Sequence, residues 1–98
     1  MTLTFTGLIW YWRGPSPFHF VTVPEQESEE LKGISGLVTY GWGMIPAVVM
    51  IGKTTYKTSL WPKNGGYIVP LKDVVRRAEH LEIDDTVTVH LAVEITLS

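Results

Sequence analysis

The chain has 98 residues, of which 45% are hydrophobic and 18% are charged, enough for one folded core and too apolar for a disordered segment. It contains no cysteine, which excludes disulfides, thiolate nucleophiles and cysteine metal sites and suits a reducing cytoplasm. The formal net charge of −2 gives no general attraction to phosphate backbones. With no secretory signal pattern and no apolar run near the ~18 residues of a membrane span, we expect one cytoplasmic domain over residues 1–98 and no membrane partner.

The first elements that the sequence predicts are two antiparallel strands joined by a turn. Residues 3–12 alternate as a strand does, and one side turns from polar to apolar partway, which indicates either a strand that leaves solvent or a bulge at Gly7. Residues 13–17 contain one glycine and two prolines, which cannot share a ladder and therefore predict a turn. Residues 18–23 form the return strand.

A short surface helix is predicted over residues 25–32. Pro24 sets a helical φ, acidic residues fill the first turn, and Gly33 is the expected stop. The helix has almost no apolar stripe, so we place it on the surface. Glycines break up residues 34–43, and the positions that fit a strand there are Leu37, Val38 and Tyr40.

Three strands are predicted in the next part of the chain. Residues 44–51 are apolar almost throughout and predict a strand buried on both faces. Residues 54–61 alternate as a second strand. The Asn-Gly-Gly run at 64–66 is a hairpin signal, and residues 67–69 form its short partner strand, which ends at a proline.

A second helix and a last strand complete the pattern. The helix is predicted over residues 71–81, and its apolar face consists of Leu71, Val74, Val75, Ala78 and Leu81. The last strand follows over residues 82–91 and continues its alternation beyond them. The positions that face one way are Val87, Val89, Leu91, Val93 and Ile95.

These elements predict a mainly β fold. We expect a small closed or partly open β-barrel of about six or seven strands, with one capping helix over residues 71–81 and a short surface helix over residues 25–32. A parallel α/β sheet is not expected, because helices do not alternate with strands.

Several runs carry a family resemblance over nearly the whole chain. They are residues 18–24 (FHFVTVP), 52–62 (GKTTYKTSLWP), 65–72 (GGYIVPLK), 75–78 (VRRA) and 84–89 (DDTVTV), together with Phe5 and Trp10. On these residues the chain resembles DUF1905, a family of small prokaryotic domains. The resemblance implies a barrel of about seven strands with one capping helix, and no reaction. Asp84 stands where the family usually has a glycine, and since Asp tolerates positive φ, we expect the turn to survive.

A second motif is similar to the half-barrel of AbrB and MazE-type DNA-binding transcription factors. It consists of residues 68–70 (IVP), Val75, Arg76, Leu81, Asp85, Val87 and Val89. Those proteins build one barrel from two short chains, whereas this chain is long enough to build one alone. Its cations are scattered and outnumbered by acids, which argues against nucleic acid. A DNA-binding or antitoxin-type module remains the alternative function.

The residues that could carry chemistry do not form a recognisable site. The histidines are His19, His80 and His90, and they lack metal-ligand spacing. The acids of residues 25–30 lie on one helix without the turn glycine of a calcium loop. We expect no catalytic residue, no metal and no cofactor, and an uncharacterised enzyme is only the third interpretation.

Aromatic side chains are the one feature that points to a ligand. Rings fill a small barrel efficiently, but they could also line an open barrel mouth with cations beside them. The candidate ligand-binding residues are Trp12, Arg13, Trp42, Lys57, Ser59, Trp61 and Tyr67. We therefore expect a non-enzymatic binding or interaction module that uses its barrel mouth or a strand edge. Its partner would be an unknown small ligand or protein, and the chain would be a monomer or homodimer.

Overall fold

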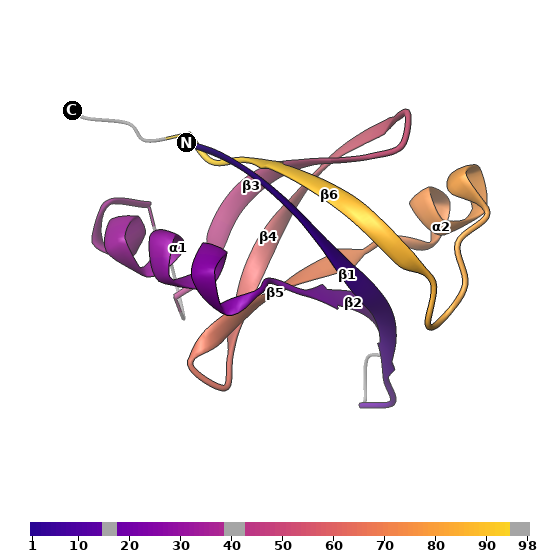
Figure 1. The fold of residues 1–98 in the computed structure, drawn as a ribbon, viewed down its shortest axis with the longest axis horizontal. Helices are drawn as coiled ribbons and strands as arrows, with labels where there is room; N and C mark the ends of the chain where they lie inside the picture. Colours follow the sequence, from indigo (N-terminus) through magenta and orange to yellow (C-terminus); the bar gives the residue numbers. More distant parts are fainter. Residues whose placement is uncertain (15–17, 39–42, 95–98) are drawn as a thin grey trace.

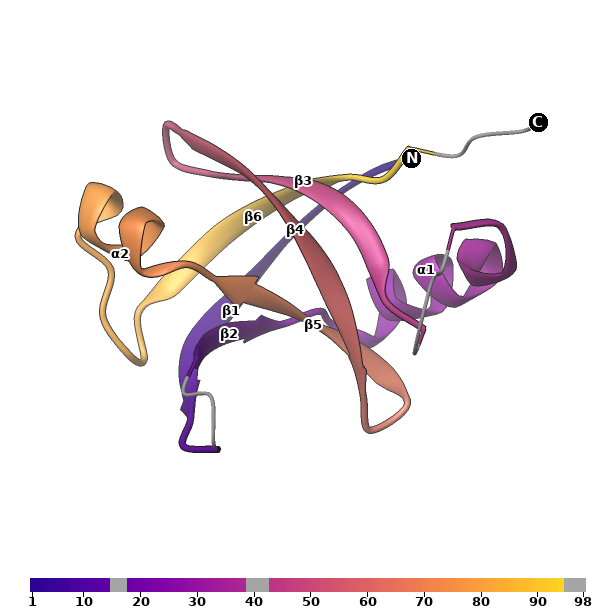
Figure 2. The same ribbon diagram turned by 180° about the vertical axis from the view of Figure 1, so that it is seen from behind.

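The computed structural model describes residues 1–14, 18–38 and 43–94. Antiparallel strands close into a barrel in the order β1-β2-β5-β4-β3-β6, with one helix at either end of the molecule (Figures 1 and 2). The elements are β1 (Thr2–Trp12), β2 (Phe18–Thr22), α1 (Glu25–Val38), β3 (Ile45–Ile51), β4 (Thr54–Lys63), β5 (Gly66–Leu71), α2 (Asp73–Glu79) and β6 (Thr86–Ala92). The predicted mainly β barrel is confirmed.

The barrel lumen is filled by one face of each strand. Its core includes Leu3, Phe5, Ile9, Val21, Ile45, Val49, Leu60, Val69, Leu71, Val87, Val89 and Leu91. The prediction that residues 44–51 are buried on both faces is wrong, because β3 alternates between buried and exposed side chains, with Val48 37% and Met50 39% exposed. In the described part of the chain the outer side chains of β3 stay partly open to solvent, so the apolar composition of this strand does not reflect burial on both faces.

Helix α1 is longer than predicted. It runs through Gly33 and Gly36, so the predicted stop at Gly33 is wrong, and the predicted strand positions Leu37 and Val38 are helical. Both glycines face open space, with no atom within 4 Å of an added Cβ. The helix is held to the core on both sides of Gly33, because Leu31 is fully buried and Ile34 packs against the core cluster. Tyr40 lies outside the described residues.

Helix α2 is shorter than predicted and buries less. Leu71 belongs to β5, and the helix ends at His80, which has the left-handed φ of 54° that terminates a helix. Val75 is fully buried, but Val74 is 62% exposed, so only part of the predicted apolar face packs on the barrel. Polar contacts add to the attachment, since the Glu79 carboxylate accepts hydrogen bonds from the β3–β4 turn.

Positive φ angles confirm two predicted turns. Asn64 and Gly65 have φ of 52° and 79° in the β4–β5 hairpin, and Asp84 has φ of 71° before β6, as expected for a residue in the place of glycine. Gly7 does not mark a bulge, because the pairing of β1 with β6 runs through it without a shift. A Cβ there would lie 2.8 Å from Val21 Cγ1, so glycine allows β1 to pass closely over β2.

The closed barrel is weakly paired at two seams. β3 and β6 pair over Val48–Met50, and β4 and β5 pair over Trp61–Lys63. Where β4 and β5 diverge, the Tyr56 hydroxyl donates a hydrogen bond of 2.9 Å to the Pro70 carbonyl and bridges the two strands. Burial raises the pKa of the Tyr56 phenol above its ordinary value, so this hydroxyl stays a donor. The barrel is thus closed, but not by a continuous ladder.

Candidate functional site

Aromatic side chains from three strands form a continuous cluster on the outer face of the barrel. We call this cluster the aromatic patch, and its members are Trp10, Trp12, Phe18, Phe20 and Trp61. Along their strands these rings alternate with the core residues Ile9, Val21 and Leu60. Since successive side chains of a strand point to opposite faces, the patch faces away from the lumen.

Phe20 lies at the centre of the aromatic patch and is fully buried. Its ring centroid is 5.1 Å from that of Trp10, 6.1 Å from that of Trp12 and 5.0 Å from that of Trp61. The rings meet in tilted or edge-to-face orientations, which aromatic pairs prefer. Trp12 of β1 and Trp61 of β4 also touch, at 6.4 Å, although β2 and β5 lie between their strands. The patch therefore ties the β1–β2 and β4–β5 hairpins together.

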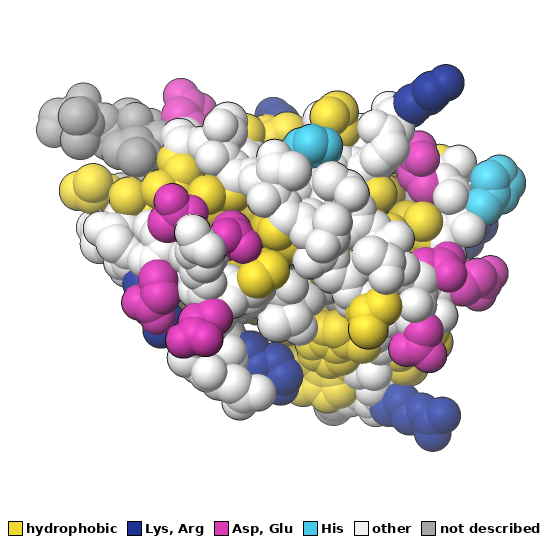
Figure 3. All heavy atoms as spheres, in the orientation of Figure 1, with side chains coloured by type: hydrophobic (Ala, Val, Ile, Leu, Met, Phe, Trp, Pro, Cys, Tyr) yellow, Lys and Arg dark blue, Asp and Glu magenta, His cyan; other side chains and the backbone are white. Residues whose placement is uncertain are grey.

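The aromatic patch is partly open to solvent and has cations beside it. Trp12 is 41% exposed, and the Lys63 ammonium lies 4.9 Å from the centroid of its ring. Arg13, next in the chain, is also exposed. Figure 3 shows an apolar area between the ends of the two hairpins, with Lys or Arg side chains on either side of it. An anionic group near these rings would meet cations.

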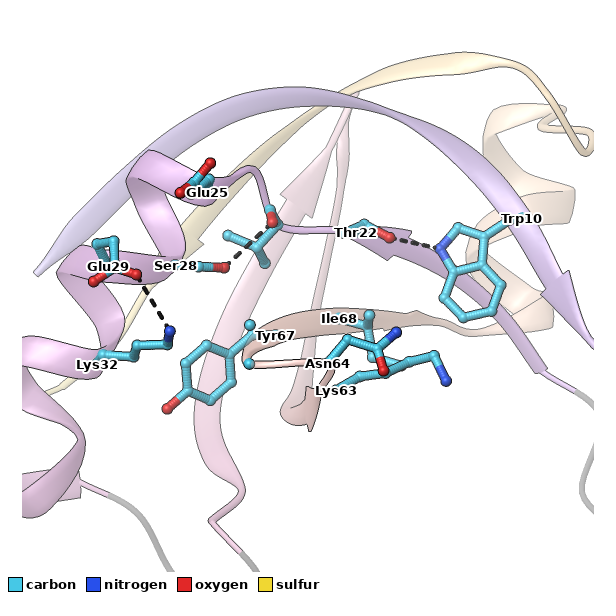
Figure 4. Close-up of a pocket in the computed structure, with 13 residues that line it drawn as sticks. Trp10, Thr22, Glu25, Ser28, Glu29, Lys32, Lys63, Asn64, Tyr67 and Ile68 are labelled. Carbon is cyan, nitrogen blue, oxygen red and sulfur yellow. Dashed lines mark hydrogen bonds and ion pairs between the residues drawn. The ribbon is translucent and has the colours of Figure 1, made fainter.

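A groove of about 440 Å³ adjoins the aromatic patch. It runs between α1 and the β4–β5 hairpin (Figure 4). Trp10 belongs to both the groove and the aromatic patch, and Lys63, the cation beside the patch, also lines the groove. The Trp10 indole N–H donates a hydrogen bond of 2.9 Å to Thr22 Oγ1, which fixes the ring at this end. Glu25 and Glu29 of α1 line the other end. The groove therefore passes from rings and a cation to carboxylates.

The structure gathers several of the predicted ligand-binding residues on this surface. Trp12 and Trp61 meet in the aromatic patch. Lys57 and Ser59 precede Trp61 on the same outward row of β4. Lys57 is exposed and Ser59 is half-buried. The rings lie on the outer face rather than in the lumen, and ligand binding by these residues stays a prediction.

The remaining candidates are placed differently. Arg13 is exposed beside Trp12, and Tyr67 belongs to the core cluster, where it is 7% exposed and lines the groove. Trp42 lies outside the described residues. The patch also contains Trp10, Phe18 and Phe20, with Lys63 beside it, and the sequence analysis did not select these four residues as candidates. The available signal was the spacing of two pairs of rings, 10 with 12 and 18 with 20, on strands already predicted to pair.

The histidines do not converge on one site. His19 is buried on the inner row of β2, with its ring centroid 4.7 Å from that of Tyr11. Burial, followed by the nearby Arg76 guanidinium, lowers the pKa of His19. His90 shares a hydrogen bond of 3.0 Å with Thr4, and His80 is the exposed residue that ends α2. Over the described ranges, no group of three or more His, Asp or Glu residues could hold a metal ion.

Three further findings bear on identity. In the described part of the chain, none of the helices has the length and apolar character needed to cross a bilayer. A family model described as a domain of unknown function, DUF1905, matches residues 5–91. A search of curated proteins finds no match.

Proposed function

The chain belongs to the DUF1905 family of domains of unknown function, and we propose that it is a non-enzymatic module that docks an extended segment of a partner protein. The docking surface is the aromatic patch together with the adjoining groove. The observation that carries this proposal is their junction at Trp10, beside Lys63. A pocket with apolar anchors and a few polar groups along its walls is the usual form of a recognition site.

The exposed part of the aromatic patch supplies the apolar anchor. Trp12 keeps 41% of its surface in water, although Phe20 beneath it is fully buried. Removing such a ring from water on binding is favourable by ~25 cal/mol per Å² of apolar surface. Trp and Arg side chains dominate the energetics of protein interfaces, and both types are present here in Trp12 and Arg13.

The groove suits an extended polypeptide. Its floor includes Thr22 and Ile68, and its walls are α1 on one side and the β4–β5 hairpin on the other (Figure 4). Glu29 and Asn64 along these walls offer hydrogen-bonding groups to a peptide backbone. A peptide is expected to dock in this groove rather than to add a strand to the sheet, because each strand of the closed barrel already has a neighbour on both sides.

Ring geometry argues against single-stranded nucleic acid as the ligand. Stacking platforms present open ring faces to the bases, whereas the Lys63 ammonium lies over Trp12 and the rings of Phe20 and Trp61 meet edge to face. Carboxylates at the α1 end of the groove would also repel a phosphate backbone. We therefore favour peptide over nucleic acid, and the experiment below also tests binding of an oligonucleotide.

Display of random peptides tests the proposal. The wild-type domain is used for selection, and enriched peptides are measured against Trp12→Ala, with Leu8→Ala as the matched control. Leu8 is 56% exposed on the same outward row of β1 but contributes no ring to the patch. We expect Trp12→Ala to weaken binding by about 2 kcal/mol, roughly thirtyfold, and Leu8→Ala to leave it unchanged.

Two results would contradict the proposal. One is the absence of enriched peptides, or enriched peptides that bind Trp12→Ala as tightly as the wild type. The other is tight binding of a labelled oligothymidylate whose affinity falls steeply with salt, which would favour the nucleic-acid alternative.

A further inference from the structure

Building on the proposed docking function, we infer that the bound segment is asymmetric in charge. It places an aromatic or apolar anchor flanked by carboxylates on the aromatic patch, and neutral or basic side chains beside α1. This inference names the chemistry of the partner, and it rests on the different charges at the two ends of the surface.

The patch end of the surface offers unpaired cations. Lys63 lies over Trp12, and Arg13 follows Trp12 in the chain. Both cations are exposed, and within the described part of the chain neither is paired with a carboxylate. A ligand carboxylate beside the anchor would supply that missing partner.

The α1 end of the surface has the opposite character. Glu25 and Glu29 line the groove there, on the side away from Trp10 (Figure 4). Lys32 is already committed to Glu29, with 3.2 Å between Nζ and Oε1, whereas Glu25 has no ion-pair partner among residues 1–14, 18–38 and 43–94. A ligand carboxylate would be repelled at this end, and a ligand cation would be attracted.

Opposite charges at two ends of one groove set the position of the ligand as well as its affinity. A segment with its carboxylates beside the anchor makes favourable pairs at both ends, while the opposite arrangement makes like-charge contacts at both. Single exposed ion pairs contribute little, but several contacts of one sign add up to about tenfold in affinity. The effect depends on the position of charge relative to the anchor, so it holds for either chain direction of the peptide.

Two labelled peptides of identical composition and zero net charge test the inference. Each has about twelve residues, enough for an extended segment of roughly 40 Å, with a pair of phenylalanines near one end. In the first, aspartates flank the phenylalanines and lysines occupy the far end. In the second, the aspartates and lysines are exchanged. We expect the first to bind the wild-type domain about tenfold more tightly by fluorescence anisotropy, and the difference to shrink as salt is added.

Charge-reversal variants locate the effect. Lys63→Glu should abolish or reverse the preference for the first peptide. Arg77 is an exposed residue of α2 outside the patch and the groove, so Arg77→Glu should retain that preference. Circular dichroism confirms that both variants are folded.

The outcomes separate the two proposals. Equal binding of both peptides, or a preference unchanged in Lys63→Glu, overturns the charge asymmetry and leaves peptide docking standing. Binding of neither peptide overturns peptide docking as well, because the phenylalanine anchor then has no place on the patch.

Discussion

The lumen core and the aromatic patch lie on opposite faces of the same strands, yet they are built differently. The lumen is filled mainly by aliphatic side chains such as Ile9, Val49 and Leu60, all fully buried. The patch is made of rings, its centre Phe20 is equally buried, and its outer member Trp12 stays 41% exposed. The chain itself buries the lumen core, whereas the patch combines the buried Phe20 with the partly exposed Trp12. We therefore expect Phe20 to serve stability and, under the proposed docking function, Trp12 to serve binding.

The largest effect is expected from removing the base of the aromatic patch. Phe20→Ala deletes a fully buried ring that contacts Trp10, Trp12 and Trp61, and we expect it to lower the free energy of unfolding by about 3–5 kcal/mol. Leu60→Ala, the matched lumen variant, should cost about 2–5 kcal/mol. Urea unfolding measures both. A loss below about 1 kcal/mol for Phe20→Ala would show that the outer cluster is not a second core.

The next largest effect separates stability from binding within the patch. Trp12→Ala removes an exposed ring with edge contacts, so we expect it to lower the free energy of unfolding by about 1 kcal/mol, while it weakens binding of selected peptides by about 2 kcal/mol. Unfolding in urea and peptide titration of the same variant give the two numbers. If stability falls more than binding, Trp12 belongs with Phe20 as a structural residue.

The sequence predicted the faces of the strands well because alternation is a local property. The row of Val87, Val89, Leu91 and Val93 was predicted to share one face of the last strand, and these side chains lie together in the lumen core. Errors arose where burial depends on neighbours distant in the chain. β3 has one row of partly exposed side chains among the described residues, and α1 continues past Gly33, where Ile34 packs against the core cluster.

The site was predicted in part, for a similar reason. Trp12 and Trp61 were selected as ligand-binding residues, but their meeting on the outer face depends on the strand order β1-β2-β5-β4. That order cannot be read from spacing, because β5 enters the sheet between β2 and β4 from later in the chain. Phe20 was missed because its alternation with Val21 does not reveal which strand covers its outer side.

A moderate effect is expected at the seam between β4 and β5, on the lumen side of the wall. Tyr56→Phe removes the hydroxyl that donates to the Pro70 carbonyl and leaves that acceptor without its partner in a partly buried position. We expect the free energy of unfolding to fall by about 1–2 kcal/mol. Peptide binding on the outer face should not change, which makes this variant a control for Trp12→Ala. An unchanged urea midpoint would mean that the seam does not depend on this bridge.

The smallest effect concerns pH and tests the polar end of the inner face. His19 is buried beside Tyr11, and burial together with Arg76 lowers its pKa in the folded chain below the ordinary value of about 6.5 that it has when unfolded. Between these two pKa values the unfolded chain binds a proton that the folded chain does not. The free energy of unfolding should therefore fall as the pH decreases through about 6.5 and level off below the folded pKa.

Comparison with His19→Gln isolates this contribution, because glutamine does not titrate and the rest of the chain is unchanged. Urea midpoints at about pH 7.5 and pH 5.5 should show a larger loss on acidification for the wild type than for the variant. Nearby Asp73 and Glu82 raise the pKa of His19 and so limit the difference. Equal losses in the two proteins would mean that the imidazole is protonated as readily in the folded chain as in the unfolded one. The inner face of the barrel would then tolerate a charged imidazole at His19. It would differ less from the outer patch, which has cations beside it, than the burial of His19 indicates.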